Sequence, residues 1–176
     1  MIATTIEDDD HRLFYIAIGE ALSEFSSLEH ALCNCFCVSM GTGLNNIPAY
    51  RAFWAIAAFE GKLKMTTTAV REIIKPSAEV CARWDKLTKQ VRGKNKTRNE
   101  IAHGTLVSYT DDKCSAVRLM KYYYSNSIND SGPIPLQSDY MTLGQIQNAR
   151  CAFRLTRNKL IEFAAEVQNL LKSRKA

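Results

Sequence analysis

Apolar residues recur at spacings of three and four along most of this chain, which is the period of amphipathic helices. The first such segment predicts a helix over residues 10–38, and the acids Asp8–Asp10 are placed to cap it. The next segment predicts a helix from Pro48 to Lys75. The predicted inward stripes are Phe14, Ile18, Ala21, Phe25, Leu28, Leu32 and Cys35 in the first helix, and Phe53, Trp54, Ala57, Ala58, Gly61 and Met65 in the second.

A third helix is predicted from a Ser77 cap to Gly104, with Val80, Trp84, Leu87 and Val91 on its buried face. Helical spacing extends this stripe to Asn95, Arg98 and Ala102, so Arg98 is expected on or beside the inward face. Buried arginines need partners. Glu29 and Glu60 each stand in a largely apolar neighbourhood, and either can pair with Arg98 across the bundle, as a structural ion pair that fixes helix register or as support for a catalytic arginine.

The pattern changes after the third helix. Residues 105–109 and 115–124 alternate and are rich in β-branched and aromatic residues, which predicts a two-stranded hairpin. A polar loop with Gly and Pro follows it. For the tyrosines of this hairpin, Tyr122–Tyr124, we favour a role in core or dimer packing over a role in stacking on RNA bases.

Thr142 and Gln145 have the spacing of a capping box for a last helix that continues to about Lys172. Its predicted inward stripe is Ile146, Phe153, Leu160, Ala164, Val167 and Leu171. The coarse prediction is a mainly all-α fold, a bundle of four principal helices forming one domain over residues 1–176. The hairpin and its loop are an insertion at about residues 105–140, before the last helix.

A chain of 176 residues with 46% apolar content is long enough for one domain with a sizeable core. Its opening, "MIATTIEDDD", has neither the basic nor the apolar region of a signal peptide. The longest uncharged run, Ala31–Tyr50, contains "GTGLNNIP" and would break up within a bilayer. We therefore expect a soluble cytoplasmic protein without a membrane partner.

Six cysteines include the cluster "CNCFC", Cys33 to Cys37. Cys33 and Cys37 share a helix face while Cys35 points elsewhere, and neither a spaced histidine nor a second cysteine pair follows them. We therefore favour reduced thiols buried in the core over a zinc site, and expect neither a metal nor another cofactor.

The net charge of +5 is unevenly distributed, because seven of the cations lie between residues 83 and 98 against the single acid Asp85. This basic stripe favours a polyanionic partner, and a solvated helix face is the alternative. Lys94 and Lys96 lead up to Arg98 and are candidate substrate-binding residues. Lys62 is interpreted as an exposed lysine rather than a phosphate contact.

Arg98 and His103 lie five residues apart, or about 140° around a helix, whereas Asn99 and His103 are four apart and share a face. His103 is next to the predicted helix end, where the helix dipole favours a protonated imidazole. An imidazole can move protons near neutral pH, and a guanidinium binds phosphate through paired hydrogen bonds. The two groups together suit a phosphodiester.

The string "RNEIAHG", Arg98–Gly104, combines an arginine and a polar residue with an apolar-Ala pair, a histidine and a glycine. This RNEIAHG motif resembles the signature of the HEPN superfamily (higher eukaryotes and prokaryotes nucleotide-binding). The segments "AFWAIAAFEGKLKM" and "WDKLTKQVRGKNKTRNEIAHG" are similar to the second and third helices of bacterial HEPN-like proteins. The resemblance implies a HEPN-like helical bundle.

The resemblance also implies a metal-independent endoribonuclease site in which Arg98 and His103 are catalytic and Asn99 orients the histidine or the substrate. It implies a homodimer whose two motifs face one cleft, with RNA as the substrate. Similar proteins are toxins of toxin–antitoxin or phage-defence systems, often neutralised by an antitoxin partner such as a nucleotidyltransferase. The alternative is a catalytically inactive module that binds nucleotides, RNA or protein, in which Arg98 is a structural cation and His103 a helix cap.

Overall fold

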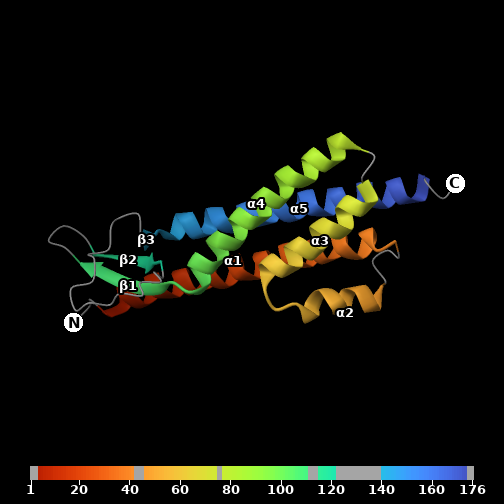
Figure 1. The fold of residues 1–176 in the computed structure, drawn as a ribbon. Helices are drawn as coiled ribbons and strands as arrows, with labels where there is room; N and C mark the ends of the chain where they lie inside the picture. Colours follow the sequence, from red (N-terminus) through yellow and green to blue (C-terminus); the bar gives the residue numbers. More distant parts are fainter. Residues whose placement is uncertain (1–3, 42–45, 75–76, 111–114, 122–139, 174–176) are drawn as a thin grey trace, which may run out of the picture. The chain divides into compact units, whose positions relative to one another are not determined.

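The computed structural model describes residues 4–41, 46–74, 77–110, 115–121 and 140–173. They form five helices and three short strands, which confirms the mainly helical prediction (Figure 1). No helix within these ranges is both long enough and apolar enough to cross a bilayer. In chain order the elements are α1 (Thr4–Ser39), α2 (Ile47–Ala55), α3 (Phe59–Ile74), α4 (Ala78–Ala102), β1 (Thr105–Thr110), β2 (Ser115–Met120), β3 (Tyr140–Met141) and α5 (Leu143–Ser173).

Two predicted helix caps are confirmed. The Ser77 hydroxyl accepts a hydrogen bond from the Val80 N–H at 3.3 Å and so begins α4. At the start of α5, the Thr142 N–H donates to Gln145 Oε1 at 2.8 Å while the Gln145 N–H donates to Thr142 Oγ1 at 3.2 Å. This reciprocal pair is a capping box.

The acids Asp8–Asp10 do not cap the first helix, as the sequence had suggested, because α1 already begins at Thr4. They lie in its second turn instead. The helix dipole favours acids mainly in the first turn, so it contributes little at these positions.

The predicted second helix is divided, so the prediction of four principal helices is wrong and the described chain has five. α2 ends at Ala55, Ile56 has an extended backbone, and α3 begins at Phe59. A Cβ atom added to Gly61 would lie 2.9 Å from Ile56 Cγ2. The glycine thus lets the Ile56 side chain fold back on α3. Ala57 and Ala58, predicted to be inward, are exposed in this connection.

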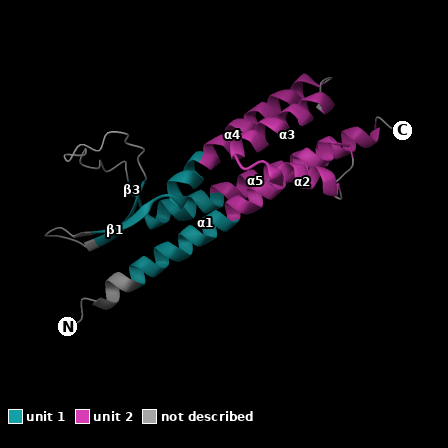
Figure 2. Ribbon diagram, turned by 60° about the horizontal axis from the view of Figure 1, so that its bottom comes forward, with its two compact units in different colours: residues 1–23, 96–151 teal, residues 24–95, 152–176 magenta. Residues whose placement is uncertain are grey.

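The chain divides into two compact units, each made of two separate segments (Figure 2). Unit 1 comprises residues 1–23 and 96–151, and unit 2 comprises residues 24–95 and 152–176. α1, α4 and α5 each contribute residues to both units.

The core of unit 2 is aromatic and lies between helices. The Phe25 ring is 5.4 Å from the rings of both Phe59 and Phe153, and the Trp84 ring is 4.9 Å from that of Phe163. These rings join α1, α3, α4 and α5. The predicted stripes are confirmed here, since the buried residues include Phe25, Leu28, Leu32, Cys35, Val80, Trp84, Leu87, Val91, Phe153, Leu160, Ala164 and Val167.

Unit 1 contains the sheet, with strand order β1-β2-β3 and antiparallel pairing throughout. The predicted hairpin is confirmed as β1 and β2, while the two-residue strand β3 was not predicted. Tyr122–Tyr124 lie outside the described residues. Hydrogen bonds connect α1 to the rest of the unit: His11 Nε2 bonds to Ser108 Oγ of β1 at 3.0 Å, and Arg150 of α5 donates to Glu20 at 2.6 Å.

Candidate functional site

The RNEIAHG motif forms the C-terminal end of α4 and lies within unit 1. α4 ends at Ala102, and the backbone N–H of His103 donates to the Asn99 carbonyl at 3.1 Å, which closes the last turn. Gly104 follows, and β1 begins at Thr105. The motif therefore occupies the junction between a helix and the sheet.

Arg98 and Asn99 contact one another through their side chains. Arg98 Nη1 donates a hydrogen bond to Asn99 Oδ1 at 2.8 Å. Arg98 is half-buried, whereas Asn99 and His103 are exposed. The Asn99 amide therefore orients the guanidinium, and Asn99 is joined to His103 through the backbone.

The inward stripe of α4 runs past Arg98 to Ile101, which is buried, while Ala102 is exposed. The prediction that Ala102 continues the stripe is wrong, and the expectation that Arg98 lies beside the inward face is confirmed. The stem of Arg98 can thus pack beside the core while its charged end stays near the surface.

The two carboxylates expected as partners of Arg98 are held by other cations. Glu60 accepts hydrogen bonds from Arg92 Nε at 3.0 Å and from Arg92 Nη2 at 2.6 Å. These bonds lower the pKa of the Glu60 carboxyl and raise that of Arg92. Glu29 is paired with Lys62.

Lys62 is a buried cation, so its interpretation as an exposed lysine is wrong. Its Nζ atom lies 2.8 Å from Glu29 Oε1 and 4.3 Å from the centre of the Trp54 ring, with the Phe53 ring at 5.4 Å. The lysine side chain is 7% exposed and that of Glu29 is 16% exposed. Ion pairing and aromatic faces replace the lost water.

The two candidate substrate-binding lysines differ in position. Lys96 is exposed and belongs to unit 1 with the motif, whereas Lys94 is half-buried and belongs to unit 2. Residues two apart on a helix point in directions about 160° apart, so the two lysines lie on nearly opposite faces. The basic stripe is also partly neutralised, because Arg83 pairs with Glu166 and Arg92 with Glu60.

The cysteine cluster belongs to the core of unit 2. Cys33 Sγ and Cys37 Sγ are 4.0 Å apart on one face, and Cys35 Sγ donates to the Leu160 carbonyl at 3.3 Å on another. Burial raises the pKa of Cys33 to about 12 and also raises those of Cys35 and Cys37. Within the described ranges, no group of three or more His, Cys, Asp or Glu side chains could hold a metal ion.

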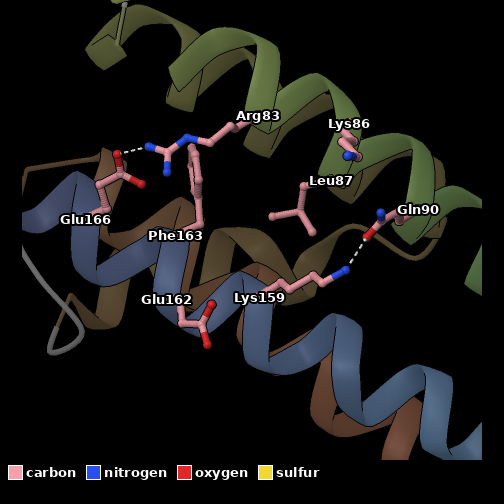
Figure 3. A pocket seen from close by; sticks show the side chains of 8 residues that line it. All are labelled: Arg83, Lys86, Leu87, Gln90, Lys159, Glu162, Phe163 and Glu166. Atoms are coloured by element: carbon pink, nitrogen blue, oxygen red, sulfur yellow. Dashed lines mark hydrogen bonds and ion pairs between the residues drawn. The ribbon is translucent and has the colours of Figure 1, made fainter. Parts of the chain in front are cut away.

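A cavity of about 320 Å³ lies in unit 2 between α4 and α5 (Figure 3). Arg83 pairs with Glu166 at one end, and Lys159 donates to Gln90 at 3.3 Å at the other. Leu87 and Phe163 project into the space between these bridges. The other lining residues are Lys86 and Glu162, so no residue of the motif contributes to this cavity.

Gly104 is required by close packing rather than by a left-handed backbone, since Gly41 alone has a positive φ in the described part of the chain. A Cβ atom on Gly104 would lie 2.8 Å from both Cγ and Cδ1 of Leu119 and 2.9 Å from the Glu100 carbonyl oxygen. Leu119 is thus a neighbour of the motif that the sequence analysis did not identify. Its only sequence signal was its place in the predicted hairpin.

Comparisons with protein-family models, with curated proteins and with solved structures found no match. Any function is therefore inferred from the chain's own residues.

The end of α4 combines a guanidinium oriented by an amide with an exposed imidazole. The C-terminal end of a helix carries a partial negative charge, so the helix itself repels a phosphate. Side-chain cations must supply the attraction, and an arginine does this with two parallel hydrogen bonds. This arrangement can bind a phosphodiester and move a proton beside it.

Proposed function

We propose that the protein is a metal-independent endoribonuclease of the HEPN type, with Arg98 as the phosphate clamp and His103 as general acid or base. The observation that carries the proposal is the juxtaposition of Arg98 and Asn99, whose side chains are bonded at 2.8 Å, one turn before the exposed His103. The resemblance of the RNEIAHG motif to the HEPN signature supports the same assignment.

The reaction requires proton transfer at two oxygens and neutralisation of charge on phosphorus. The ribose 2′-oxygen forms a bond to phosphorus while the bond from phosphorus to the 5′-oxygen breaks. One proton leaves the 2′-hydroxyl and one reaches the 5′-oxygen, and an imidazole performs either transfer near neutral pH. The products are a 2′,3′-cyclic phosphate and a 5′-hydroxyl.

We further propose that the active form is a homodimer whose two motifs share one cleft. Each chain contributes one His103, while the reaction needs both a proton acceptor and a proton donor. Two copies of the motif supply both, and two copies of Arg98 supply more positive charge to a site at helix ends that repel phosphate. Lys96, exposed in the same unit as the motif, is proposed as an RNA contact.

The HEPN resemblance also supports a proposal for the role of the protein in the cell. The protein acts on RNA in the cytoplasm as a toxin or a phage-defence component, and an antitoxin such as a nucleotidyltransferase partner restrains it. The bundle itself is proposed to be HEPN-like.

Gel analysis of total RNA and tRNA, incubated with purified variants in EDTA, tests the proposal. Arg98→Ala is expected to lower cleavage about 10²- to 10³-fold, the usual loss when a charge-stabilising donor is removed. Arg92→Ala, on the same helix but paired with Glu60, is the matched control and should cleave like the wild type. Equal cleavage by both variants would refute the role of Arg98.

A competing function, an RNA- or nucleotide-binding module without catalysis, is favoured by two observations at the end of α4. The His103 N–H and the close packing of Gly104 both serve the helix end irrespective of any chemistry. A structural ion pair of Arg98 with Glu29 or Glu60 does not support this alternative, since these carboxylates bind Lys62 and Arg92. It predicts stabilisation of the folded protein by RNA or nucleotide without cleavage.

A further inference from the structure

We propose that Leu119 of β2 is a positioning residue for His103, and that the sheet thereby sets the backbone position from which the imidazole projects. The effect on catalysis rests on the proposed function. The positioning itself does not, because it follows from contacts within unit 1.

The first step is the contact between Leu119 and the motif. Gly104 lies so close to the Leu119 side chain that a Cβ atom added to Gly104 would be 2.8 Å from both Cγ and Cδ1 of Leu119. On another side the same atom would lie 2.9 Å from the Glu100 carbonyl, which is backbone. Gly104 is therefore held between the last turn of α4 and a side chain of the sheet.

The second step is that Leu119 is itself fixed. It is fully buried and lies on the central strand of the sheet. Leu106 of β1 is its partner on one side and Met141 of β3 its partner on the other. A buried side chain between two paired neighbours has little room to move, because protein interiors are packed to crystal-like density.

The third step concerns His103, which lies between two fixed points of the backbone. On one side its N–H is bonded to the Asn99 carbonyl, and on the other Gly104 is seated on Leu119. The imidazole is exposed, so these constraints act on it through the backbone, by fixing the position and direction of the His103 Cα–Cβ bond. A misplacement of about 1 Å in a catalytic group can lower a rate about 100-fold.

The chain offers a matched pair of variants on one strand. Leu119→Ala removes the contact with Gly104, whereas Val117→Ala removes a buried side chain from the same face of β2, two residues away. Leu119→Met keeps a long apolar side chain at the contact and serves as the conservative variant.

The three histidines provide three NMR reporters. His103 reports on the motif, His11 on the sheet through its bond to Ser108, and His30 on unit 2. We expect Leu119→Ala to shift the His103 imidazole signals and leave those of His30 unchanged. Val117→Ala, which is opposite Ser108, should affect His11 but not His103, and Leu119→Met should restore the wild-type His103 signals.

In the cleavage assay, Leu119→Ala should lower kcat at least tenfold with a smaller change in KM, and Val117→Ala should lower it less than twofold. If Leu119→Ala does not fold, Gly104→Ala displaces the same contact from the other side and should shift the same His103 signals. Unchanged His103 signals in either folded variant would overturn the inference. A wild type that does not cleave RNA, with the NMR shifts as expected, would refute the proposed function and leave the positioning role intact.

Discussion

The Arg98 guanidinium donates a hydrogen bond from Nη1 to Oδ1 of the adjacent residue, Asn99, at 2.8 Å. Neighbouring residues on a helix point about 100° apart, so the long arginine side chain bends around the axis to make this contact. The bond occupies one edge of the guanidinium and fixes the direction of the rest. In the proposed nuclease, Asn99 therefore acts on phosphate binding through Arg98.

Two substitutions of Asn99 should distinguish its role in orienting the Arg98 guanidinium from the effect of a negative charge at this position. Asn99→Ala removes the acceptor, so the guanidinium loses its fixed direction, and we expect kcat to fall about 10- to 100-fold. Asn99→Asp keeps the acceptor but adds a carboxylate that repels the phosphate, so KM should rise as well. Steady-state cleavage of an RNA oligomer measures both constants. Full activity of Asn99→Ala would contradict this role, and stability should change by less than about 0.5 kcal/mol because the residue is exposed.

Lys62 should matter for stability rather than for RNA cleavage. Lys62→Met leaves the Glu29 carboxylate largely buried without its 2.8 Å partner, which costs about 3 to 5 kcal/mol. Lys64→Met, an exposed lysine on the same helix, is the control and should change the free energy of unfolding by less than about 0.5 kcal/mol. Urea denaturation measures both. Similar unfolding midpoints for the two variants would show that the ion pair contributes little.

The buried thiols should resist alkylation. Thiolates react and thiols do not, and burial raises the pKa of Cys33 to about 12. With iodoacetamide at pH 8, mass spectrometry should find the exposed Cys151 modified before Cys33, Cys35 and Cys37. Cys33, Cys35 and Cys37 should react only after denaturation. Early modification of any of these three in the folded protein would contradict their burial.

The raised pKa of Cys33 should also make the protein less stable at alkaline pH. The pKa of Cys33 is raised in the folded state from 9.0 to about 12, so its contribution to stability is fully present below pH 9. Between these values the unfolded chain loses the proton and the folded chain keeps it, which lowers the unfolding free energy by about 1.4 kcal/mol per pH unit. Urea midpoints from pH 8 to pH 11 should fall more steeply for the wild type than for Cys33→Ala. Parallel curves would show that Cys33 does not contribute.

Local signals in the sequence were sufficient for much of the fold. The Ser77 cap and the capping box of Thr142 and Gln145 depend on residues within one turn, and both were predicted. The buried stripes of α1, α4 and α5 follow the helical period, and the structure buries most of their residues.

Contacts between distant residues were not predictable in this way. Residues 56–58, which separate α2 from α3, contain neither glycine nor proline, and the packing of Ile56 against Gly61 of α3 joins residues that no helical period relates. Lysine is usually a surface residue. Lys62 is buried because Glu29, 33 positions earlier in the chain, lies beside it and pairs with it. The two-residue strand β3 is too short to show any alternation.

The candidate site shows the same division. Arg98 and Asn99 lie near the end of α4 and His103 directly follows it, so the alignment of Asn99 with His103, four residues apart, follows from helical spacing. The contact between Gly104 and Leu119 joins that helix to a strand and depends on how the sheet packs. The sequence predicts Gly104 as the residue that ends the helix. The structure requires a glycine there because a larger side chain would clash with Leu119.

Cleavage of RNA in EDTA by the wild type, His103→Ala and His30→Ala is the most direct test of the proposed endoribonuclease. His30 is an exposed histidine in unit 2, so it controls for the loss of an imidazole elsewhere. The account predicts that the wild type and His30→Ala leave 2′,3′-cyclic phosphate ends and that a folded His103→Ala does not cleave. Cleavage by His103→Ala at the wild-type rate would contradict it.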